Sequence, residues 1–265
     1  MITIKELADY LNKQIQTFGG TWSYIVRRRK NDAGSLSEDM ISLNEGHIHR
    51  SASMIKVLIL AALCTSDISF EEKLRIDSVP RVEGGGALQE MNGDALLTIH
   101  ALASLMIVLS DNLATNILID KLGMDNINRY AKQLELQATK LQRAMMDFEA
   151  AQRGSENMMS PADYDKLLWH IYDNRREPRF NAAWEILGRQ QFRDRIPYHW
   201  NEDIIFHHKT GELDGVEHDG GILEGKNATY SIIIFASDLK SNAVGGMQEA
   251  SLGYYIYNYL EKEKS

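Results

Sequence analysis

The stretch Ser53-Met54-Ile55-Lys56 runs directly into the apolar sequence Val57-Leu58-Ile59-Leu60, and we expect both to belong to one helix that begins near Ser53. Ser and Lys three positions apart share one helix face and can touch. A Ser in the first turn lies near unpaired backbone N–H groups, which favour an oxyanion beside it. Lys56 can act as a base only if burial or a second cation lowers its pKa. The alternative is a helix-capping Ser and a solvated Lys.

A second polar group, Ser110-Asp111-Asn112, ends an apolar helix that we predict over Leu102–Leu109. A hydroxyl at this place can relay a proton to a leaving group, and an Asn amide can hold a substrate carbonyl. Ser, Asp and Asn also favour helix ends for structural reasons, so a plain helix junction is the alternative.

A third group, Lys209-Thr210-Gly211, follows the β-rich stretch Ile204–His208, and we expect it at the end of an edge strand. Lys and Thr there would make a cationic, hydroxyl-bearing rim suited to a substrate carboxylate, and Gly would let a substrate backbone approach closely. The N–H of Glu212 is available as an oxyanion donor beside that of Ser53. Taken alone, each of the three groups is common by chance.

Strand patterns occur near both ends of the chain. Aromatic and β-branched residues predict strands over 22–26, 40–43, 206–209, 221–223 and 229–236, with a turn at 31–34. Helical spacing predicts a first helix that Gly19-Gly20 stops and a last helix over Gly246–Lys262. The core-facing residues of these two helices are Leu7, Leu11, Ile15, Phe18, Ile256, Tyr259 and Leu260. Between residues 53 and about 172, helical periodicity dominates.

This order of elements predicts an α+β fold. Both termini build an antiparallel sheet packed with terminal helices, and an all-helical lobe is inserted between them. We assign residues 1–48 and 197–265 to the lobe with the sheet, and residues 49–196 to the helical lobe. The site of such a protein is expected in the groove between the lobes.

The composition of the 265 residues, 44% hydrophobic and 25% charged, is that of an ordinary soluble protein. A net charge of -8 argues against nucleic acid as a partner, and the one basic cluster, Arg27–Lys30, runs into a turn. Cys64 is alone in an apolar run, so we expect an inert buried thiol. Met1–Leu7 does not have the pattern of a secretory signal, and no apolar run is long enough to span a membrane, so we expect a cytoplasmic protein.

The order Ser-x-x-Lys, Ser-Asp-Asn, Lys-Thr-Gly, in these contexts, is the motif set of class A β-lactamases and penicillin-binding proteins. The chain resembles the class A β-lactamase family over nearly its whole length. Leu105–Asn116 is similar to the family's helix around Ser-Asp-Asn, and Asn157–Pro161 to the exit of its omega loop. The resemblance implies a β-lactamase/transpeptidase-like fold and a serine hydrolase acting on a β-lactam or a related amide or ester.

The resemblance also implies roles for individual residues. Ser53 would attack the acyl carbonyl, and Lys56 would assist the removal of its proton. Ser110, helped by Lys209, would pass a proton to the leaving nitrogen. The N–H groups of Ser53 and Glu212 would bind the oxyanion. The substrate would be held by Asn112, Thr210 and Gly211. The implied partner is a small molecule, with no metal or organic cofactor and no nucleic acid, membrane or obligatory protein partner.

The omega loop departs from the family pattern. Class A enzymes carry Arg-x-Glu-x-x-Leu-Asn there, and the Glu activates the water that frees the acyl group. Alignment of Arg143 with the family Arg puts Met145 at the Glu position. A thioether cannot accept a proton from water. If the loop is remodelled, Asp147 or Glu149 would replace the missing Glu as the base. The alternative is that both carboxylates are solvated or salt-bridged. Loss of the base would leave a penicillin-binding or sensing protein that is acylated but releases its acyl group poorly.

Three other features of the sequence concern substrate, metal and phosphate binding. The run Glu212–Asp219 is acidic, so Glu212 and Asp219 suit an amine-bearing substrate. His207 and His208 are neighbours on a predicted strand and therefore point to opposite faces, which argues against a shared metal ion. Gly84-Gly85-Gly86 lacks the Lys of a phosphate-binding loop, and we interpret it as a flexible loop.

Overall fold

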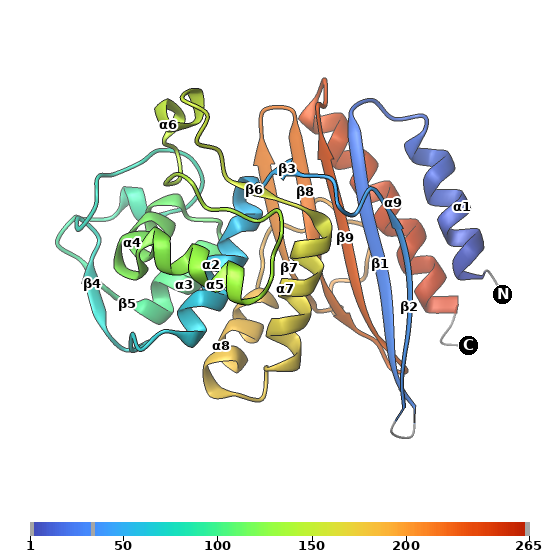
Figure 1. Cartoon of the computed structure of the whole chain (residues 1–265), viewed down its shortest axis with the longest axis horizontal. Helices are drawn as coiled ribbons and strands as arrows, with labels where there is room; N and C mark the ends of the chain where they lie inside the picture. Colours follow the sequence, from blue (N-terminus) through green and yellow to red (C-terminus); the bar gives the residue numbers. More distant parts are fainter. Residues whose placement is uncertain (1–2, 33–34, 263–265) are drawn as a thin grey trace.

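A five-stranded antiparallel sheet lies at the centre of the computed structural model, which describes residues 3–32 and 35–262 (Figure 1). The strand order is β2-β1-β9-β8-β7. The strands are β1 (Thr21–Asp32), β2 (Ser35–Leu43), β7 (Phe206–Leu213), β8 (Val216–Glu224) and β9 (Thr229–Ser237). The prediction of a sheet built from both ends of the chain is confirmed, although each of its five strands is longer than predicted. Residues 33 and 34 of the predicted turn lie outside the described residues.

Helices cover both faces of the sheet (Figure 1). The N-terminal helix α1 (Ile4–Ile15) and the C-terminal helix α9 (Asn242–Lys262) cover one face. The other helices are α2 (Ile55–Thr65), α3 (Ile99–Val108), α4 (Asn112–Leu122), α5 (Met124–Gln133), α6 (Phe148–Gln152), α7 (Pro161–Asp173) and α8 (Pro178–Leu187). Short elements are β3 (His49–Arg50), β4 (Lys73–Arg75), β5 (Leu96–Thr98), β6 (Met158–Met159) and the 3₁₀ turns η1 (Ala52–Met54) and η2 (Leu88–Glu90). The predicted α+β class is therefore confirmed.

The sheet separates two hydrophobic cores, because successive strand residues point to opposite faces. Tyr24 and Val26 of β1 pack with α1 and α9, whereas Ile25 between them packs with the helices on the other face. The predicted core residues Ile256, Tyr259 and Leu260 of α9 are buried. The helix α1 ends at Ile15, earlier than predicted, because Thr17 and Phe18 hydrogen-bond back to Gln14 and Ile15 as turns.

The helix α2 is buried on every side. All residues from Ile55 to Cys64 are inaccessible to solvent or nearly so, and this includes Lys56. A helix that is hydrophobic all round belongs in a core, so its one amine is carried into an apolar environment. Burial also raises the pKa of the Cys64 thiol to about 12, as expected for an inert core residue.

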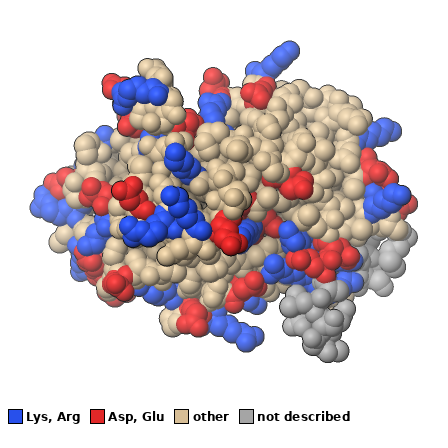
Figure 2. All heavy atoms as spheres, in the orientation of Figure 1, with Lys and Arg blue, Asp and Glu red and all other residues tan. Residues whose placement is uncertain are grey.

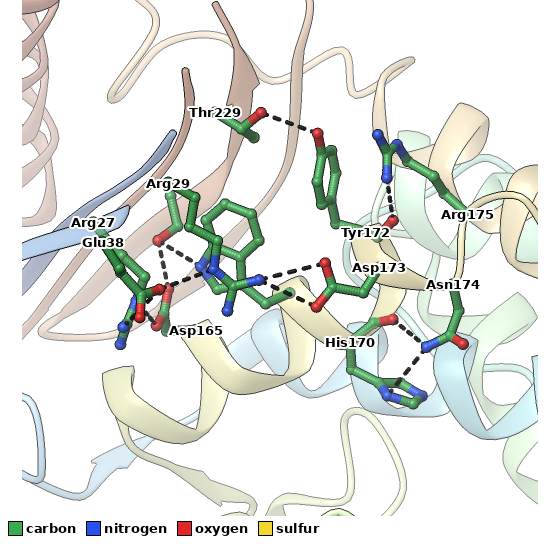
Figure 3. Close-up of polar contacts among 12 residues, drawn as sticks. Arg27, Arg29, Glu38, Asp165, His170, Tyr172, Asp173, Asn174, Arg175 and Thr229 are labelled. Atoms are coloured by element: carbon green, nitrogen blue, oxygen red, sulfur yellow. Dashed lines mark hydrogen bonds and ion pairs between the residues drawn. The ribbon is translucent and has the colours of Figure 1, made fainter. Parts of the chain in front are cut away.

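The basic run of β1 binds α7 to the sheet (Figure 3). Arg27 Nε donates to Asp165 at 2.8 Å, and Arg29 Nη1 donates to Asp173 at 3.1 Å. The same two arginines contact Glu38 of β2, at 3.1 and 2.9 Å. Arg27 and Arg29 therefore form ion pairs that join β1 to β2 and α7. Acidic and basic side chains are interspersed over the face shown in Figure 2.

Within the described ranges, no helix is both long and apolar enough to cross a bilayer. The boundaries of the predicted lobes at residues 48/49 and 196/197 stay a prediction.

Candidate active site

Ser53 lies in the 3₁₀ turn η1, which joins β3 to α2. The preceding residue, Ala52, has a φ of +46°, a left-handed conformation that is rare for residues other than Gly, Asn and Asp. Hydrogen bonds on both sides hold this turn, since Ser51 N donates to Asn157 O at 2.7 Å and Met54 N donates to Ser51 O at 3.0 Å. Strained backbone of this kind is typical of functional sites, where the surrounding structure fixes it.

Lys56 is fully buried behind Ser53. Its Nζ donates to Ser110 O at 2.8 Å, to Ser110 Oγ at 3.0 Å and to Asn112 Oδ1 at 2.9 Å. Burial lowers the pKa of Lys56 to about 7, although Asp111 opposes the shift. Among the described residues, no hydrogen bond joins Lys56 to the Ser53 hydroxyl, so the amine is directed at the Ser-Asp-Asn group.

Ser110 lies at the junction of α3 and α4, as predicted, with a φ of +53°. The following Asp111 caps α4 by accepting from Ala114 N at 2.9 Å. Lys209 Nζ donates to Ser110 Oγ at 3.1 Å, so this one hydroxyl lies between two amines. Burial and the proximity of Lys56 hold the pKa of Lys209 well below its usual range.

Lys209, Thr210 and Gly211 lie inside β7 and not at its end, so this part of the prediction is wrong. The strand continues to Leu213 because Asp214-Gly215, with a φ of +70° at Gly215, makes a two-residue turn into β8. The predicted edge position is confirmed by the strand order. At Gly211 a Cβ atom would lie 3.0 Å from Met54 Cγ and 3.2 Å from Ser53 N, so glycine allows β7 to pack against the turn of Ser53.

A cavity of about 750 Å³ lies in front of these groups. Ser53, Ser110, Asn112 and Thr210 line it together, whereas Lys56 and Lys209 lie behind its wall and are fully buried. The remaining lining residues are Gly84, Gly85, Leu109, Met146, Phe148, Phe192, Asp194, Arg195, Glu212, Leu213, Asp214 and Asn242. Residues from distant parts of the sequence therefore share one groove.

Sequence reasoning missed the part played by the glycine loop. Gly85 O accepts from Asn112 N at 3.0 Å, and the φ values of Gly84 and Gly86 are +101° and +113°. A Cβ atom at Gly84 would lie 2.8 Å from Asn112 Nδ2, and one at Gly86 would lie 2.3 Å from the Asp111 carboxylate. The loop is thus a packed wall of the groove. Its signal in the sequence is the run of three glycines.

Sequence reasoning also missed Arg195. This buried side chain pairs with Glu217 at 2.6 Å, Glu212 at 2.8 Å and Asp194 at 3.0 Å. No local motif marks it. Asp219, which we expected beside a substrate amine, is instead fully buried and accepts from Ile196 N at 3.1 Å. Of the two carboxylates in that prediction, only Glu212 lines the cavity.

Met145 is buried at the position where the alignment expects Glu. The Asn116 side chain fixes the Met145 backbone. It accepts from Met145 N at 2.8 Å and donates to Met145 O at 3.1 Å. Asp147 caps α6 by accepting from Ala150 N at 2.9 Å, and Glu149 is exposed beside Arg153 at 3.6 Å. Neither carboxylate lines the cavities that Ser53 borders.

The neighbouring histidines face opposite sides of β7, as the strand geometry predicts. The His207 ring stacks on Trp184 at 3.5 Å between centroids, and His208 Nδ1 lies 2.7 Å from Asp219 Oδ1. In the part of the chain that the structure describes, no three His, Cys, Asp or Glu side chains are placed to hold a metal ion.

Comparisons with known proteins identify the family and the fold of the chain. The model of the beta-lactamase enzyme family matches residues 6–260. Among solved structures, a β-lactamase from Sphaerobacter thermophilus is 24% identical, with a TM-score of 0.82 and coverage of 98% of both chains. TLA-3 extended-spectrum β-lactamase is 17% identical, with a TM-score of 0.85 and coverage of 97% of this chain and 99% of that one.

A mutant of PBP-A in an acyl-enzyme complex with penicillin G is also similar, at 21% identity, a TM-score of 0.83 and coverage of 98% of this chain and 97% of that one. A comparison with curated proteins finds no match. The structural similarities, at this level of identity, show a shared β-lactamase/transpeptidase-like fold, and the family model extends over nearly the whole chain. The chain therefore belongs to the beta-lactamase enzyme family, which is a family of hydrolases.

Proposed function

We propose that Ser53 forms an acyl-enzyme with a β-lactam or a related amide or ester, and that the acyl group is released slowly. The observation that carries this proposal is the Ser110 hydroxyl held between Lys56 and Lys209, at 3.0 and 3.1 Å, in the cavity that Ser53 also lines. Buried amines with lowered pKa values beside a nucleophile are the groups that serine acylation needs.

Acylation begins with transfer of the Ser53 proton to the neutral Lys56 amine, directly or through a water molecule, as Oγ attacks the carbonyl carbon. The C–O bond forms, and the carbonyl oxygen becomes an oxyanion. The backbone N–H groups of Ser53 and Glu212 would hold it, since Ser53 lies in the first turn of its helical segment and Glu212 lies in β7.

The leaving group needs a proton as its bond to the carbonyl carbon breaks. We assign this proton to Ser110, because its hydroxyl lines the cavity and accepts hydrogen bonds from two amines. The Ser110 alkoxide then takes the proton from Lys56, which returns Lys56 and Ser110 to their starting states and leaves the acyl group on Ser53. Asn112, Thr210 and Gly211 would hold the substrate beside Ser53, and Asn112 and Thr210 line the same cavity.

Deacylation needs a base that activates water, and Met145 supplies none. Asp147 and Glu149 are used as a helix cap and a surface ion pair, away from the cavities around Ser53. The geometry therefore favours a penicillin-binding type of protein with slow turnover over an efficient β-lactamase.

Intact-protein mass spectrometry tests the proposal. Penicillin G should add its full mass to the wild-type chain, and peptide mapping should place the adduct on Ser53. Ser53→Ala should carry no adduct, whereas Ser104→Ala, a matched change in α3 away from the groove, should carry the same adduct as wild type. Absence of any adduct from penicillin G and from activated esters would refute acylation of Ser53.

A further inference from the structure

Carboxylates outnumber cations along the main cavity. Asp194, Glu212 and Asp214 line it, and Arg195 is the one cationic side chain among the described residues that do so. Arg195 contacts two of these carboxylates, those of Asp194 and Glu212, which we call the acidic wall. An excess of negative charge favours a cationic ligand over an anionic one.

The Arg195 guanidinium is not available to a ligand carboxylate, because each of its three nitrogens donates to a carboxylate of the protein. Nε donates to Glu217 at 2.6 Å, Nη1 to Asp194 at 3.0 Å and Nη2 to Glu212 at 2.8 Å. The Arg195 side chain is 7% exposed, whereas those of Asp194 and Glu212 are 64% and 62% exposed. A ligand that enters the cavity therefore meets the carboxylates of the acidic wall before the guanidinium beneath them.

A further carboxyl group, that of Glu249 on α9, lies close to Arg195 and is fully buried. Neither of its oxygens has a hydrogen-bond partner among the described residues. Burial raises the pKa of Glu249 well above its usual range, although the charge of Arg195 opposes the shift. A buried carboxyl without a partner costs free energy, so its presence here shows that this part of the groove has too few cations for its carboxyl groups.

Aromatic rings lie beside the acidic wall. Phe192, which is 39% exposed, lines the main cavity with Asp194 and Glu212. Both wall residues also line a neighbouring cavity of about 720 Å³, where Tyr198 is 61% exposed. Carboxylates next to exposed aromatic rings suit an alkylammonium group, which gains from charge attraction and from cation–π contacts. A metal ion fits less well, because no three potential ligand side chains in the described part of the chain are placed to hold one.

The acidic wall lies on the Lys209 side of the groove. Lys209 Nζ donates to Ser110 Oγ at 3.1 Å. Burial lowers the pKa of Lys209, and the charges of Lys56 and Arg195 add to the shift, so Arg195 is a near neighbour of this amine. Because Ser110 gives its proton to the leaving group in the proposed reaction, the leaving group is the part of the substrate nearest to the acidic wall.

We propose that the acidic wall binds a positively charged group, so that the protein acts on a β-lactam, amide or ester whose leaving group carries an ammonium. The inference rests on the proposed acylation of Ser53. In the reaction, the Ser53 Oγ–acyl bond forms and the bond to the leaving oxygen or nitrogen breaks. A proton passes from Ser53 by way of Lys56 and Ser110 to the leaving atom, and the ammonium keeps its charge throughout.

The test compares penicillin G with two of its esters, the 2-(diethylamino)ethyl ester and the 3-ethylpentyl ester. All three have the same acyl group, and on the leaving-nitrogen side they are anionic, cationic and neutral, in that order. The two esters have the same shape and differ in charge. Intact-protein mass spectrometry at short times gives the second-order rate constant for acylation of Ser53. The cationic ester should react about fivefold or more faster than the neutral one, and this ratio should fall as the salt concentration rises from about 0.02 to 0.5 M.

Glu212→Gln and Asp194→Asn each remove one charge from the acidic wall and keep its shape. Each should lower the ratio of cationic to neutral ester by about two- to fivefold. Glu212→Gln also removes the ion pair at Arg195 Nη2, so penicillin G, whose carboxylate can then bind there, should react about two- to fivefold faster. A faster reaction cannot result from a folding defect. Glu71→Gln, the same change at an exposed position outside the cavity lining, should keep all three rate constants.

The outcomes separate the two proposals. Equal rate constants for the cationic and neutral esters, with an adduct on Ser53, would overturn the cation site and leave the proposed acylation standing. A cation preference that neither wall variant changes would place the ammonium elsewhere and overturn the assignment to Asp194 and Glu212. If none of the three compounds and no activated ester modified Ser53, both proposals would be wrong.

Discussion

Two buried amines, those of Lys56 and Lys209, share one hydroxyl, that of Ser110. Two ammonium groups so close together in a site of low dielectric constant repel each other, so the pair favours a state with at most one positive charge. The measured titration then belongs to the pair of Lys56 and Lys209 and not to either alone. This arrangement supplies a neutral amine for proton abstraction near neutral pH.

We expect the rate of Ser53 acylation to rise with pH through an apparent pKa near 7, because only neutral Lys56 can accept the proton. Lys56→Ala should slow acylation by about a hundredfold or more and remove this dependence. Stopped-flow acylation by p-nitrophenyl acetate measures both. Lys121→Ala, on the surface beside Glu72, is the control and should keep the wild-type profile. A wild-type rate that does not change between about pH 5.5 and 8.5 would contradict this role.

At the scale of elements, the groove is held by contacts between the glycine loop and the junction of α3 and α4. Asp111 accepts from Ala87 N and Leu88 N, both at 2.7 Å, and also caps α4. The same carboxylate thus fixes the loop, the helix and the neighbouring Ser110. A change in the loop should therefore also affect the position of the Ser110 hydroxyl.

Gly86→Ala should destabilise the protein by about 1–3 kcal/mol, because the φ of +113° strains an L residue and the new Cβ would meet Asp111. The same change at Gly246, inside α9 with open space around it, should stabilise by about 0.5–1 kcal/mol. Urea denaturation of both variants measures the difference. Equal effects of the two changes would show that the loop is not packed as described.

The elements were largely predictable from the sequence, and the groove only in part. Aromatic and β-branched residues predicted the strands near both termini. The three motifs predicted Ser53, Ser110 and Lys209 as site residues. The interior position of Lys209 in β7 is not evident from the sequence, because the turn at Asp214-Gly215 lies within the acidic run Glu212–Asp219. Alignment of Arg143 with the family Arg predicted Met145 at the Glu position of the omega loop. In the structure, two hydrogen bonds join the Met145 backbone to the Asn116 side chain.

The groove walls were not predictable because they depend on tertiary contacts. Arg195 carries no local motif, and its partners come from β7, β8 and its own segment. Phe148 follows a cap residue on a five-residue helix, where sequence periodicity gives no signal. Asp219 was misplaced because strand alternation alone does not reveal that α9 buries this face of the sheet.

At the scale of the whole molecule, two buried histidines connect the segment before Ser53 to the central sheet. The ring of His49 lies between Ser23 of β1 and Ser237 of β9, at 2.9 and 3.0 Å. His218 of β8 lies 2.9 Å from Arg50 O. Burial lowers their pKa values to about 3 and about 4, and His47 and His218 add to the effect on His49.

Because both folded pKa values lie below the ordinary value of 6.5, the two histidines stabilise the fold above pH 6.5. As the pH falls below 6.5, the unfolded state takes up protons that the folded state does not. The free energy of unfolding should then fall by about 1.4 kcal/mol per pH unit for each histidine. Urea denaturation from pH 7 to about pH 4.5 measures this slope.

His49→Gln should remove about half of the contribution of this pair to the slope, whereas His199→Gln, at the surface, should leave the slope at the wild-type value. Identical slopes for wild type and His49→Gln would mean that His49 is not buried in the neutral form.

If Ser53 is acylated and Met145 makes release slow, the lifetime of the adduct should depend on the residue at position 145. After a short exposure to penicillin G and removal of the excess, mass spectrometry follows decay of the adduct in wild type, Met145→Glu and Met145→Gln. We expect a long-lived adduct in wild type and Met145→Gln, and decay faster by about a hundredfold in Met145→Glu, which restores a base. Rapid decay in the wild type, or no adduct on Ser53, would contradict the account.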